Sequence, residues 1–256
     1  MLCGKRVSDS EKVFAITSVR EHAPFACITC GVELVLKKGQ IKIHHFAHKP
    51  PHKCRRSEGE SIEHMRCKLE IYNALLKCEN VSDVQLEHDL GTAIADVYAV
   101  IDGSPVAIEI QRSKLTVNEI VRRTEEYTRL KVNVLWIALY SSRLTEDKFS
   151  PNAWEKWCHA AYYGRVYYWS EGLKLTPYHF GEYKLYVESS SYYDQSGQEV
   201  SHGGYEKFSK RYRTPIAGPV VNLARSFDRN FRKSWSKATI VIPDCRLYLD
   251  NKKKWW

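Results

Sequence analysis

Residues 93–111, AIADVYAVIDGSPVAIEIQ, constrain the fold more than any other part of this 256-residue chain. Two apolar runs flank Asp102-Gly103, a dipeptide that is preferred in the two-residue turns of β-hairpins. Counting outward along both strands from such a turn pairs Asp96 with Glu109. We therefore expect a hairpin in which two carboxylates oppose each other.

This expected pair of acids needs something that offsets its repulsion. Directly opposed side chains have Cβ atoms about 5 Å apart, and like charges at that distance destabilise a sheet. A shared proton, a basic residue or a divalent cation with oxygen ligands would each relieve the conflict. The side-chain alternation of a strand places Gln111 on the same face as Glu109. The alternative interpretation is that Asp96 and Glu109 are ordinary outward residues of a half-exposed hairpin.

The segments around the hairpin predict a domain of the α/β class over residues 57–140. Apolar residues at helical spacing predict a helix over about 60–77. Thr116 and Glu119 form a capping box, which predicts a second helix that ends near residue 131. Between the two helices we expect three strands, namely VQLEHDL and the two strands of the hairpin. After the second helix, the apolar run VNVLWIALY is expected to be a buried strand. The predicted order is helix, three strands, helix, strand.

The first predicted helix carries a polar stripe. Glu60, His64 and Lys68 recur every four residues and therefore lie on one side of the helix, beside its apolar face. On an isolated surface helix such a stripe is an ordinary charged face. On a helix that packs against the hairpin, it would bring Glu60 towards Asp96 and Glu109.

The N-terminal segment has the composition of a small zinc-binding module, which we delimit as residues 1–56. Cys27-x2-Cys30 precedes an expected hairpin around KKGQ, and His45-x2-His48 follows it. Two thiolates and two imidazoles suit a tetrahedral structural zinc ion. The competing candidates for the same ligand positions are His44, His52 and Cys54. The other cysteines are expected to be packing residues, because no signal peptide indicates an oxidising compartment: Cys3, Cys67, Cys78, Cys158 and Cys245.

The remaining residues, 141–256, form a basic and aromatic C-terminal region. Residues 205–256 hold 13 Lys or Arg and 4 acids, which accounts for the whole net charge of +9. Such asymmetry indicates a polyanionic partner, with nucleic acid as the first candidate, and a solvated basic surface as the alternative. RVYYW and KLTPYHF predict strands. The spacing of the apolar residues predicts a helix over residues 220–235: Val220, Leu223, Phe227, Phe231 and Trp235.

No stretch of the sequence predicts a membrane segment. Runs of about 18 apolar residues are missing, and the N-terminal MLCGKRVSDSEK lacks the charged-then-apolar order of a signal peptide. The sequence therefore predicts a cytoplasmic protein that does not bind membranes.

Several motifs in the first 140 residues resemble a known family. GESIEHMRCK, ADVYAV, AIEIQRS, EIVRRTEEY and VLWI, in this order, resemble the competence-protein CoiA nuclease-like family. The order of elements is also that of the restriction-endonuclease-like PD-(D/E)xK core. The resemblance covers about residues 25–140, and the CxxC hairpin looks like the zinc-binding module that precedes the nuclease core in that family.

The resemblance implies roles for particular residues. It implies that Asp96 and Glu109 bind a catalytic Mg²⁺ or Mn²⁺ ion, and that Gln111 occupies the place of the usual motif lysine. Glu60 looks like the helix acid of such sites, with His64 and Lys68 matching the pattern E-x-x-x-H-x-x-x-K. The later positions of the motif, which imply substrate binding, are matched by Ser113, Arg123 and Tyr127.

The function that the resemblance implies is a metal-dependent endonuclease that hydrolyses DNA phosphodiester bonds, with branched or processed DNA as a candidate substrate. Gln111 offers hydrogen bonds but no positive charge, so we favour Lys68 as the source of that charge. The alternative is a nucleic-acid-binding protein on a nuclease scaffold with weak or no catalysis. A third hypothesis is a protein-interaction module built on the Tyr- and Trp-rich C-terminal region. The oligomeric state stays open, and a homodimer is one arrangement that nucleases of this fold use.

Overall fold

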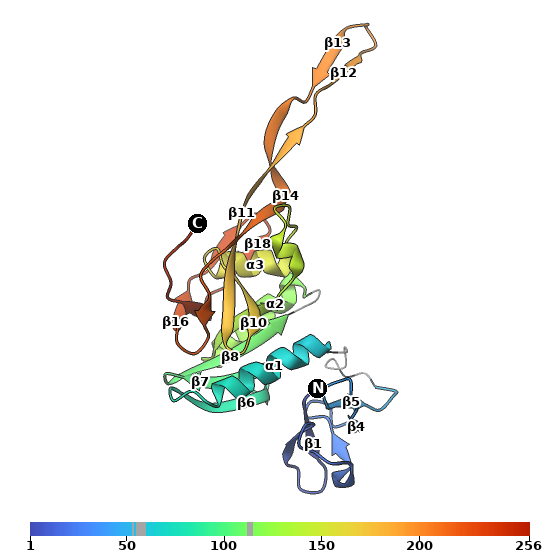
Figure 1. Cartoon of the computed structure of the whole chain (residues 1–256), viewed down its shortest axis with the longest axis vertical. Helices are drawn as coiled ribbons and strands as arrows, with labels where there is room; N and C mark the ends of the chain where they lie inside the picture. The colour runs from blue at the N-terminus through green and yellow to red at the C-terminus, as the bar shows by residue number, and fades with distance from the viewer. Residues whose placement is uncertain (53, 55–59, 112–114) are drawn as a thin grey trace.

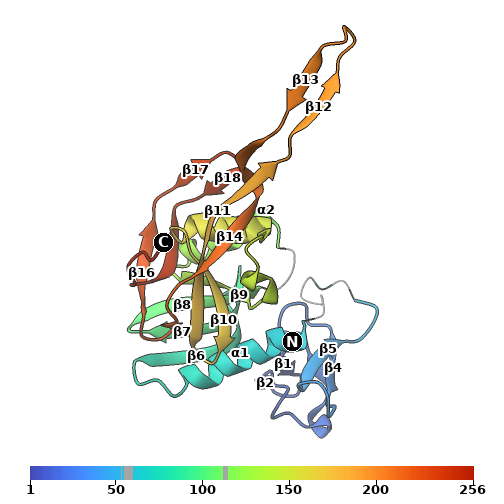
Figure 2. The same ribbon diagram turned by 45° about the horizontal axis from the view of Figure 1, so that its top comes forward.

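The computed structural model describes residues 1–52, 54, 60–111 and 115–256. The protein has a mixed α/β fold with large sheets and few helices (Figure 1). A small N-terminal sheet lies at one end of the molecule, and a long two-stranded arm extends from the other end (Figures 1 and 2). The helix that follows the N-terminal sheet lies between that sheet and the central one.

The N-terminal sheet has the strand order β2-β1-β3-β4-β5. Its strands are β1 (Cys3–Arg6), β2 (Lys12–Phe14), β3 (Phe25–Ala26), β4 (Glu33–Lys37) and β5 (His45–His48). A hairpin follows the CxxC motif as expected, but its loop is longer than the turn KKGQ. Lys37 pairs with His45, so residues 38–44 form the loop and the second strand begins later than expected.

The elements that the sequence predicts for residues 57–140 form the first part of the central sheet and two helices beside it. They are α1 (Ile62–Leu75), β6 (Val81–Asp89), β7 (Ile94–Ile101), β8 (Ser104–Gln111), α2 (Val117–Arg129) and β9 (Asn133–Leu139). Strands β6, β7 and β8 are antiparallel, and β9 is parallel to β8. Helix α1 packs against strands β6 to β10. The expected order of helix, three strands, helix and strand is confirmed.

The hairpin register is the one expected from the Asp102-Gly103 turn. Ile101 pairs with Ser104, and the pairing continues to Val97 and Ile108. Asp102 and Gly103 both have positive φ, at 48° and 71°, as a two-residue turn of the primed type requires. The pairing ends at Val97 and Ile108, one position before the expected pair of Asp96 and Glu109.

The central sheet continues into the C-terminal region, so residue 140 does not mark a break in it. Strand β10 pairs in parallel with β9, and β19 also pairs with β9 through Leu247 and Val134. The C-terminal elements are α3 (Ala153–Ala161), β10 (Val166–Glu171), β11 (Lys174–Val187), β12 (Ser190–Tyr193), β13 (Glu199–His202), β14 (Tyr205–Ala217), β15 (Val221–Asn222), β16 (Phe227–Arg232), β17 (Trp235–Lys237), β18 (Ile240–Ile242) and β19 (Cys245–Asp250). One apolar core extends from α1 to β19.

The expected helix over residues 220–235 is wrong, because this segment forms strands. Within it, Phe227–Arg232 pairs with β19. The apolar residues that suggested a helix do not share a buried face: Leu223 is buried, whereas Val220 is 57% and Phe231 47% exposed. Asn222 forms a local turn in which its side chain accepts a hydrogen bond from the amide of Ala224. Pairing with a distant strand thus overrides the local helical spacing.

Strands β11 and β14 form the arm. They pair along nearly their whole length and continue into the β12–β13 hairpin, which extends far from the body (Figure 1). Several aromatic side chains on this arm are exposed: Tyr186, Tyr192, Tyr193, Tyr205 and Phe208. Among the described residues, no helix is long and apolar enough to cross a membrane.

Candidate functional site

The polar stripe at the start of α1 faces the β7–β8 hairpin, as the sequence suggests. Ser61 caps the helix by accepting a hydrogen bond from the amide of His64, which fixes the rotation of the first turn. His64 Nε2 lies 3.2 Å from Asp96 Oδ2, and its Nδ1 lies 3.9 Å from Glu60 Oε1. One ligand atom from each of Glu60, His64 and Asp96 lies within 4.8 Å of the others. We call these three residues the acid cluster.

Lys68 forms the buried base of this cluster. Its ammonium group donates hydrogen bonds to Glu60 and, at 2.8 Å, to Glu87 Oε1, and it lies 3.5 Å from Asp96 Oδ1. Lys68 and Glu87 are both 0% exposed. Burial acts against the charge of Lys68, but Glu87, Glu60 and Asp96 hold the pKa of its ammonium well above the ordinary value.

Asp96 is held in its charged form. Although burial acts in the opposite direction, the charges of Lys68 and then His64 hold the pKa of Asp96 well below its usual range. The amide of Ile110 also donates a hydrogen bond of 3.0 Å to Asp96 Oδ2. The carboxylate that the hairpin contributes is therefore fixed by contacts from both α1 and β8.

Glu87 belongs to the site, although sequence reasoning did not identify it. Besides Lys68, its carboxylate accepts hydrogen bonds from the amides of Leu2 at 2.9 Å and Cys3 at 3.1 Å. Glu87 has a φ of 45°, a left-handed conformation that non-glycine residues rarely adopt. No local pattern in VQLEHDL predicts this conformation, because contacts with α1 and the N-terminal sheet define it.

Glu109 lies beside the acid cluster in a second set of contacts. Its Oε1 accepts hydrogen bonds from Arg123 and from the hydroxyl of Tyr127, while Oε2 is buried without a described hydrogen-bond partner. Burial raises the pKa of Glu109 to about 7, against the charge of Arg123, and the charge of Asp96 adds to the rise. A buried carboxylate oxygen without a hydrogen-bond partner is costly, which makes Oε2 an unusual feature of this site.

The remaining predicted site residues lie around Glu109. Gln111 is half-buried at the end of β8, two residues beyond Glu109 on the same strand. Arg123 is partly exposed, but its guanidinium faces Glu109 and the carbonyl of Ile94. Tyr127 is completely buried, and its hydroxyl donates a hydrogen bond to Glu109 Oε1. Ser113 lies outside the described residues.

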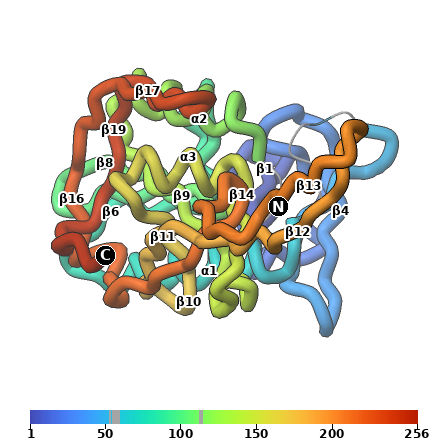
Figure 3. Tube along the Cα trace, turned by 90° about the horizontal axis from the view of Figure 1, so that it is seen from above, coloured from blue at the N-terminus to red at the C-terminus, as the bar shows by residue number. Residues whose placement is uncertain are grey.

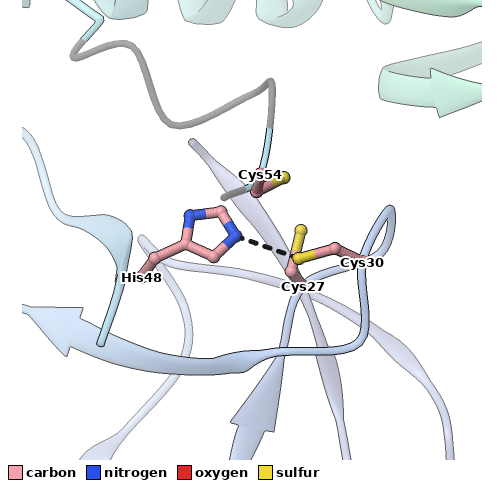
Figure 4. Close-up of side chains that lie close together, drawn as sticks. All are labelled: Cys27, Cys30, His48 and Cys54. Carbon is pink, nitrogen blue, oxygen red and sulfur yellow. Dashed lines mark hydrogen bonds between the residues drawn. The ribbon is translucent and has the colours of Figure 1, made fainter. Parts of the chain in front are cut away.

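A second group of metal-ligand side chains lies in the N-terminal sheet. One ligand atom from each of Cys27, Cys30, His48 and Cys54 lies within 4.8 Å of the others, and Cys30 Sγ is 3.4 Å from His48 Nε2 (Figure 4). We call these four residues the Cys3His cluster. The CxxC turn is closed by a hydrogen bond from the amide of Gly31 to the carbonyl of Cys27, for which Gly31 adopts a φ of 70°. Four thiolate and imidazole ligands form a closed set suited to a structural metal ion such as zinc.

The structure corrects one expected ligand of this group. His45 does not join the cluster, and its place is taken by Cys54. His45 and His48 are three residues apart on β5, so their side chains point to opposite faces of the strand. The Nδ1 atom of His45 instead donates a hydrogen bond to the carbonyl of Ile43.

Comparison with known proteins connects both groups to one family. A family model described as the competence protein CoiA nuclease-like domain matches residues 60–175, and one described as the competence protein CoiA N-terminal domain matches residues 8–57. The chain belongs to the competence protein CoiA family. The acid cluster lies in the CoiA nuclease-like domain and the Cys3His cluster in the CoiA N-terminal domain.

One curated relative supports this assignment. Competence protein CoiA from Bacillus subtilis (strain 168) is 34% identical over 120 residues, which is 46% of this chain and 32% of the relative. The match thus spans about a third of the relative's length. No solved structure gives a significant match.

The acid cluster has the chemistry of a divalent-cation site in this CoiA nuclease-like domain. Two carboxylates and one imidazole provide the oxygen and nitrogen ligands that Mn²⁺ accepts, and the carboxylates alone suit Mg²⁺. The unpaired Oε2 of Glu109 adds a further oxygen nearby. The carboxylates of Glu60, Glu87 and Asp96 meet the positive groups of Lys68 and His64, and Glu60 Oε2 also lies 3.2 Å from the N-terminal ammonium of Met1.

Proposed function

We propose that this CoiA-family protein is a metal-dependent endonuclease that hydrolyses DNA phosphodiester bonds, with branched or processed DNA as a candidate substrate. The observation that supports the proposal most directly is the acid cluster, whose three ligand atoms lie within 4.8 Å of one another beside a buried lysine. The order of elements from α1 to β9 supports our assignment of a restriction-endonuclease-like core.

In this proposal Glu60, His64 and Asp96 hold a Mg²⁺ or Mn²⁺ ion, and Glu109 Oε2 is available as a fourth ligand atom. The ion would supply the activation of water and the stabilisation of charge on the phosphate. Lys68 is completely buried, so it acts on the carboxylates and does not touch the substrate. We assign it as a positioning residue, which provides beneath Asp96 the positive charge that Gln111 lacks.

The Cys3His cluster is proposed to hold a structural zinc ion. His48, Cys27 and Cys54 are buried, and only Cys30 is exposed. Burial also lowers the pKa of His48, which favours the neutral imidazole that metal binding requires. Because all four ligand positions come from the protein, this site would stabilise the fold and leave no position for a substrate.

The C-terminal strands are proposed to bind the DNA backbone. Arg229 and Lys233 are exposed, and the guanidinium of Arg232 lies 3.9 Å from the ring centroid of Tyr163. Deleting residues 205–256 would not test this role, because it removes strands of the central sheet, among them β19. Replacing Arg229 and Lys233 with alanine changes the charge and leaves the sheet in place.

A second candidate function is DNA binding with weak or no catalysis. It is favoured by the contacts of Glu109, whose Oε1 is held by Arg123 and Tyr127 and not by the acid cluster. It is also favoured by Gln111 at the position of the usual motif lysine. In this case the acid cluster would be a remnant of a nuclease site.

The deciding experiment is the cleavage of labelled duplex, single-stranded and branched DNA with Mg²⁺, Mn²⁺ or a chelator. The parent protein is compared with Asp96→Ala and Glu109→Ala, and Asp83→Ala serves as a control on the exposed part of β6. Cleavage that requires the metal, Asp96 and Glu109 supports the nuclease. Tight, salt-sensitive binding without cleavage supports the second function instead.

A further inference from the structure

A cavity of about 300 Å³ lies between the β4–β5 loop of the N-terminal sheet and the start of α1. One wall is formed by Lys42 and His45, from the β4–β5 loop and the start of β5. The other wall is formed by the residues that lead into α1: Glu60, Ser61, Ile62, Glu63 and Met65. The cavity is thus built jointly by the two parts that match separate CoiA family models.

The cavity reaches the acid cluster, because Glu60 belongs to both. A group that enters the cavity therefore lies next to the proposed metal ligands. The Cys3His cluster belongs to the same sheet as the other wall, since His48 pairs with Leu34 on β4. The loop that faces the acid cluster is consequently anchored by the proposed zinc site.

The sequence around this loop is strongly basic. Residues 34–57 contain seven Lys or Arg and no Asp or Glu. Lys42 is exposed, and among the described residues no carboxylate lies within ion-pair distance of it, whereas Lys49 pairs with Glu33 at 3.4 Å. The charge of Lys42 is therefore available to an anion that enters the cavity.

The opposite wall is acidic. Glu60 and Glu63 would repel a free anion, so the cavity is not a general anion site. A phosphodiester chain fits a cavity with one basic and one acidic wall. One phosphate can contact the basic wall while the neighbouring phosphate lies at the cation of the acid cluster. Strands β16 and β19, which carry part of the other basic region, lie on the opposite side of the molecule from β4 (Figure 3).

We propose that the β4–β5 loop, residues 38–44, holds the strand of DNA that is to be cut. Lys42 binds a phosphate that flanks the one at the acid cluster, and His45 forms the adjacent wall. The proposal rests on the proposed function and deepens it, because it assigns substrate positioning to the N-terminal sheet. It predicts that binding depends on Lys42 whether or not the strand is cleaved.

The test measures binding separately from cleavage. Fluorescence anisotropy of a labelled DNA is recorded with Ca²⁺ in place of Mg²⁺ or Mn²⁺, and again with a chelator, over a series of salt concentrations. Lys42→Gln is compared with Lys49→Gln, which removes the same charge from an exposed lysine of the same sheet outside the cavity.

We expect Lys42→Gln to weaken DNA binding roughly fivefold or more and to lower the log–log salt slope by about 0.7 to 0.9, the value for one lost phosphate contact. Lys49→Gln should change both quantities little. Equal effects of the two substitutions, or no DNA binding by the parent protein, would overturn the proposal.

A failure of the loop assignment can be distinguished from a failure of the proposed nuclease function. If Lys42 governs binding but the parent protein does not cleave DNA with any metal, the loop assignment stands and the nuclease assignment fails. If Asp96→Ala abolishes cleavage while Lys42→Gln behaves like Lys49→Gln, the nuclease stands and the loop assignment fails.

Discussion

The two metal-ligand groups of this protein differ in almost every physical respect. The Cys3His cluster has four ligands, three of them sulfur. The acid cluster has three ligands, two of them carboxylates, and lies over the buried ion pair of Lys68 and Glu87. A closed set of soft ligands suits a structural ion, whereas an incomplete set of hard ligands beside a cavity suits a reaction.

The environment of the two groups explains why only one needs a rigid network of charges. Thiolates in a CxxC turn are oriented by the backbone itself, here through Gly31. The carboxylates of the segment before α1 and of two strands repel one another, and the buried cation of Lys68 keeps them together. The predictions below test this difference, beginning with the largest expected effect.

Removal of zinc should have the largest effect on stability. Structural zinc sites in small modules contribute apparent binding free energies of about 10–16 kcal/mol, so Cys27→Ser should unfold the N-terminal sheet. Elemental analysis should show one zinc ion per parent chain and less than half of that in the variant. Cys78→Ser, which lies outside the cluster, should keep the metal. If the parent protein, purified without chelator, contains no zinc, the Cys3His cluster is not a zinc site.

The finding that Cys54, and not His45, belongs to the ligand set can be tested in the same way. Cys54→Ser should lose zinc, because Cys54 belongs to the cluster. His45→Asn should retain it, because the His45 ring is turned to the carbonyl of Ile43. The reverse pattern would favour the ligand set that the sequence suggests.

Replacement of Lys68 should have the next largest effect on stability. Lys68→Met keeps most of the volume but leaves Glu60, Glu87 and Asp96 without their shared cation. We expect the free energy of unfolding in urea to fall by about 3–5 kcal/mol, as when one partner of a buried ion pair is removed. The exposed Lys77→Met should change it by less than about 0.5 kcal/mol. Adding Glu87→Gln to Lys68→Met should restore part of the loss.

Replacement of the hairpin acid should affect catalysis more than stability. Asp96→Asn keeps the shape of the side chain but removes a ligand charge, so we expect cleavage to slow by roughly a hundredfold or more, which corresponds to several kcal/mol of transition-state stabilisation. Zinc content should stay at the parent level. Asp83→Asn serves as the control in the cleavage assay. An unchanged rate in Asp96→Asn would show that the acid cluster is not the reaction site.

Replacement of His64 should have the smallest effect, which concerns the preference for one metal ion over another. Imidazole favours Mn²⁺ over Mg²⁺ more than a carboxylate does, so His64→Asn should lower the ratio of Mn²⁺ to Mg²⁺ affinity by several-fold. Calorimetric titration of both ions into zinc-loaded protein measures this ratio. A ratio that stays the same would remove His64 from the ligand set.

Local patterns predicted the elements that local chemistry controls. Asp102-Gly103 determined the hairpin register, and Thr116 caps α2 by accepting a hydrogen bond from the amide of Glu119 as expected. The four-residue spacing of Glu60, His64 and Lys68 also predicted their common direction. Each of these features depends on contacts within a few residues, or on the fixed period of a helix or strand.

Features that depend on distant contacts were missed. Glu87 receives its partners from residues 2, 3 and 68, and its positive φ leaves no trace in the sequence. The helix expected at 220–235 failed because pairing with β19 outweighs the spacing of its apolar residues. The spacing of His45 in the sequence predicts a ligand, but the alternation of side chains on β5 turns it away from His48.

The contacts of Glu87 also bear on how the protein unfolds. Its carboxylate is completely buried between Lys68 of the central domain and the amides of Leu2 and Cys3 of the N-terminal sheet. The two parts cannot separate without leaving this charge short of partners or exposing it to water, and either outcome costs free energy. Thermal denaturation of the zinc-loaded chain should therefore follow a single cooperative transition, although the chain matches two separate family domains.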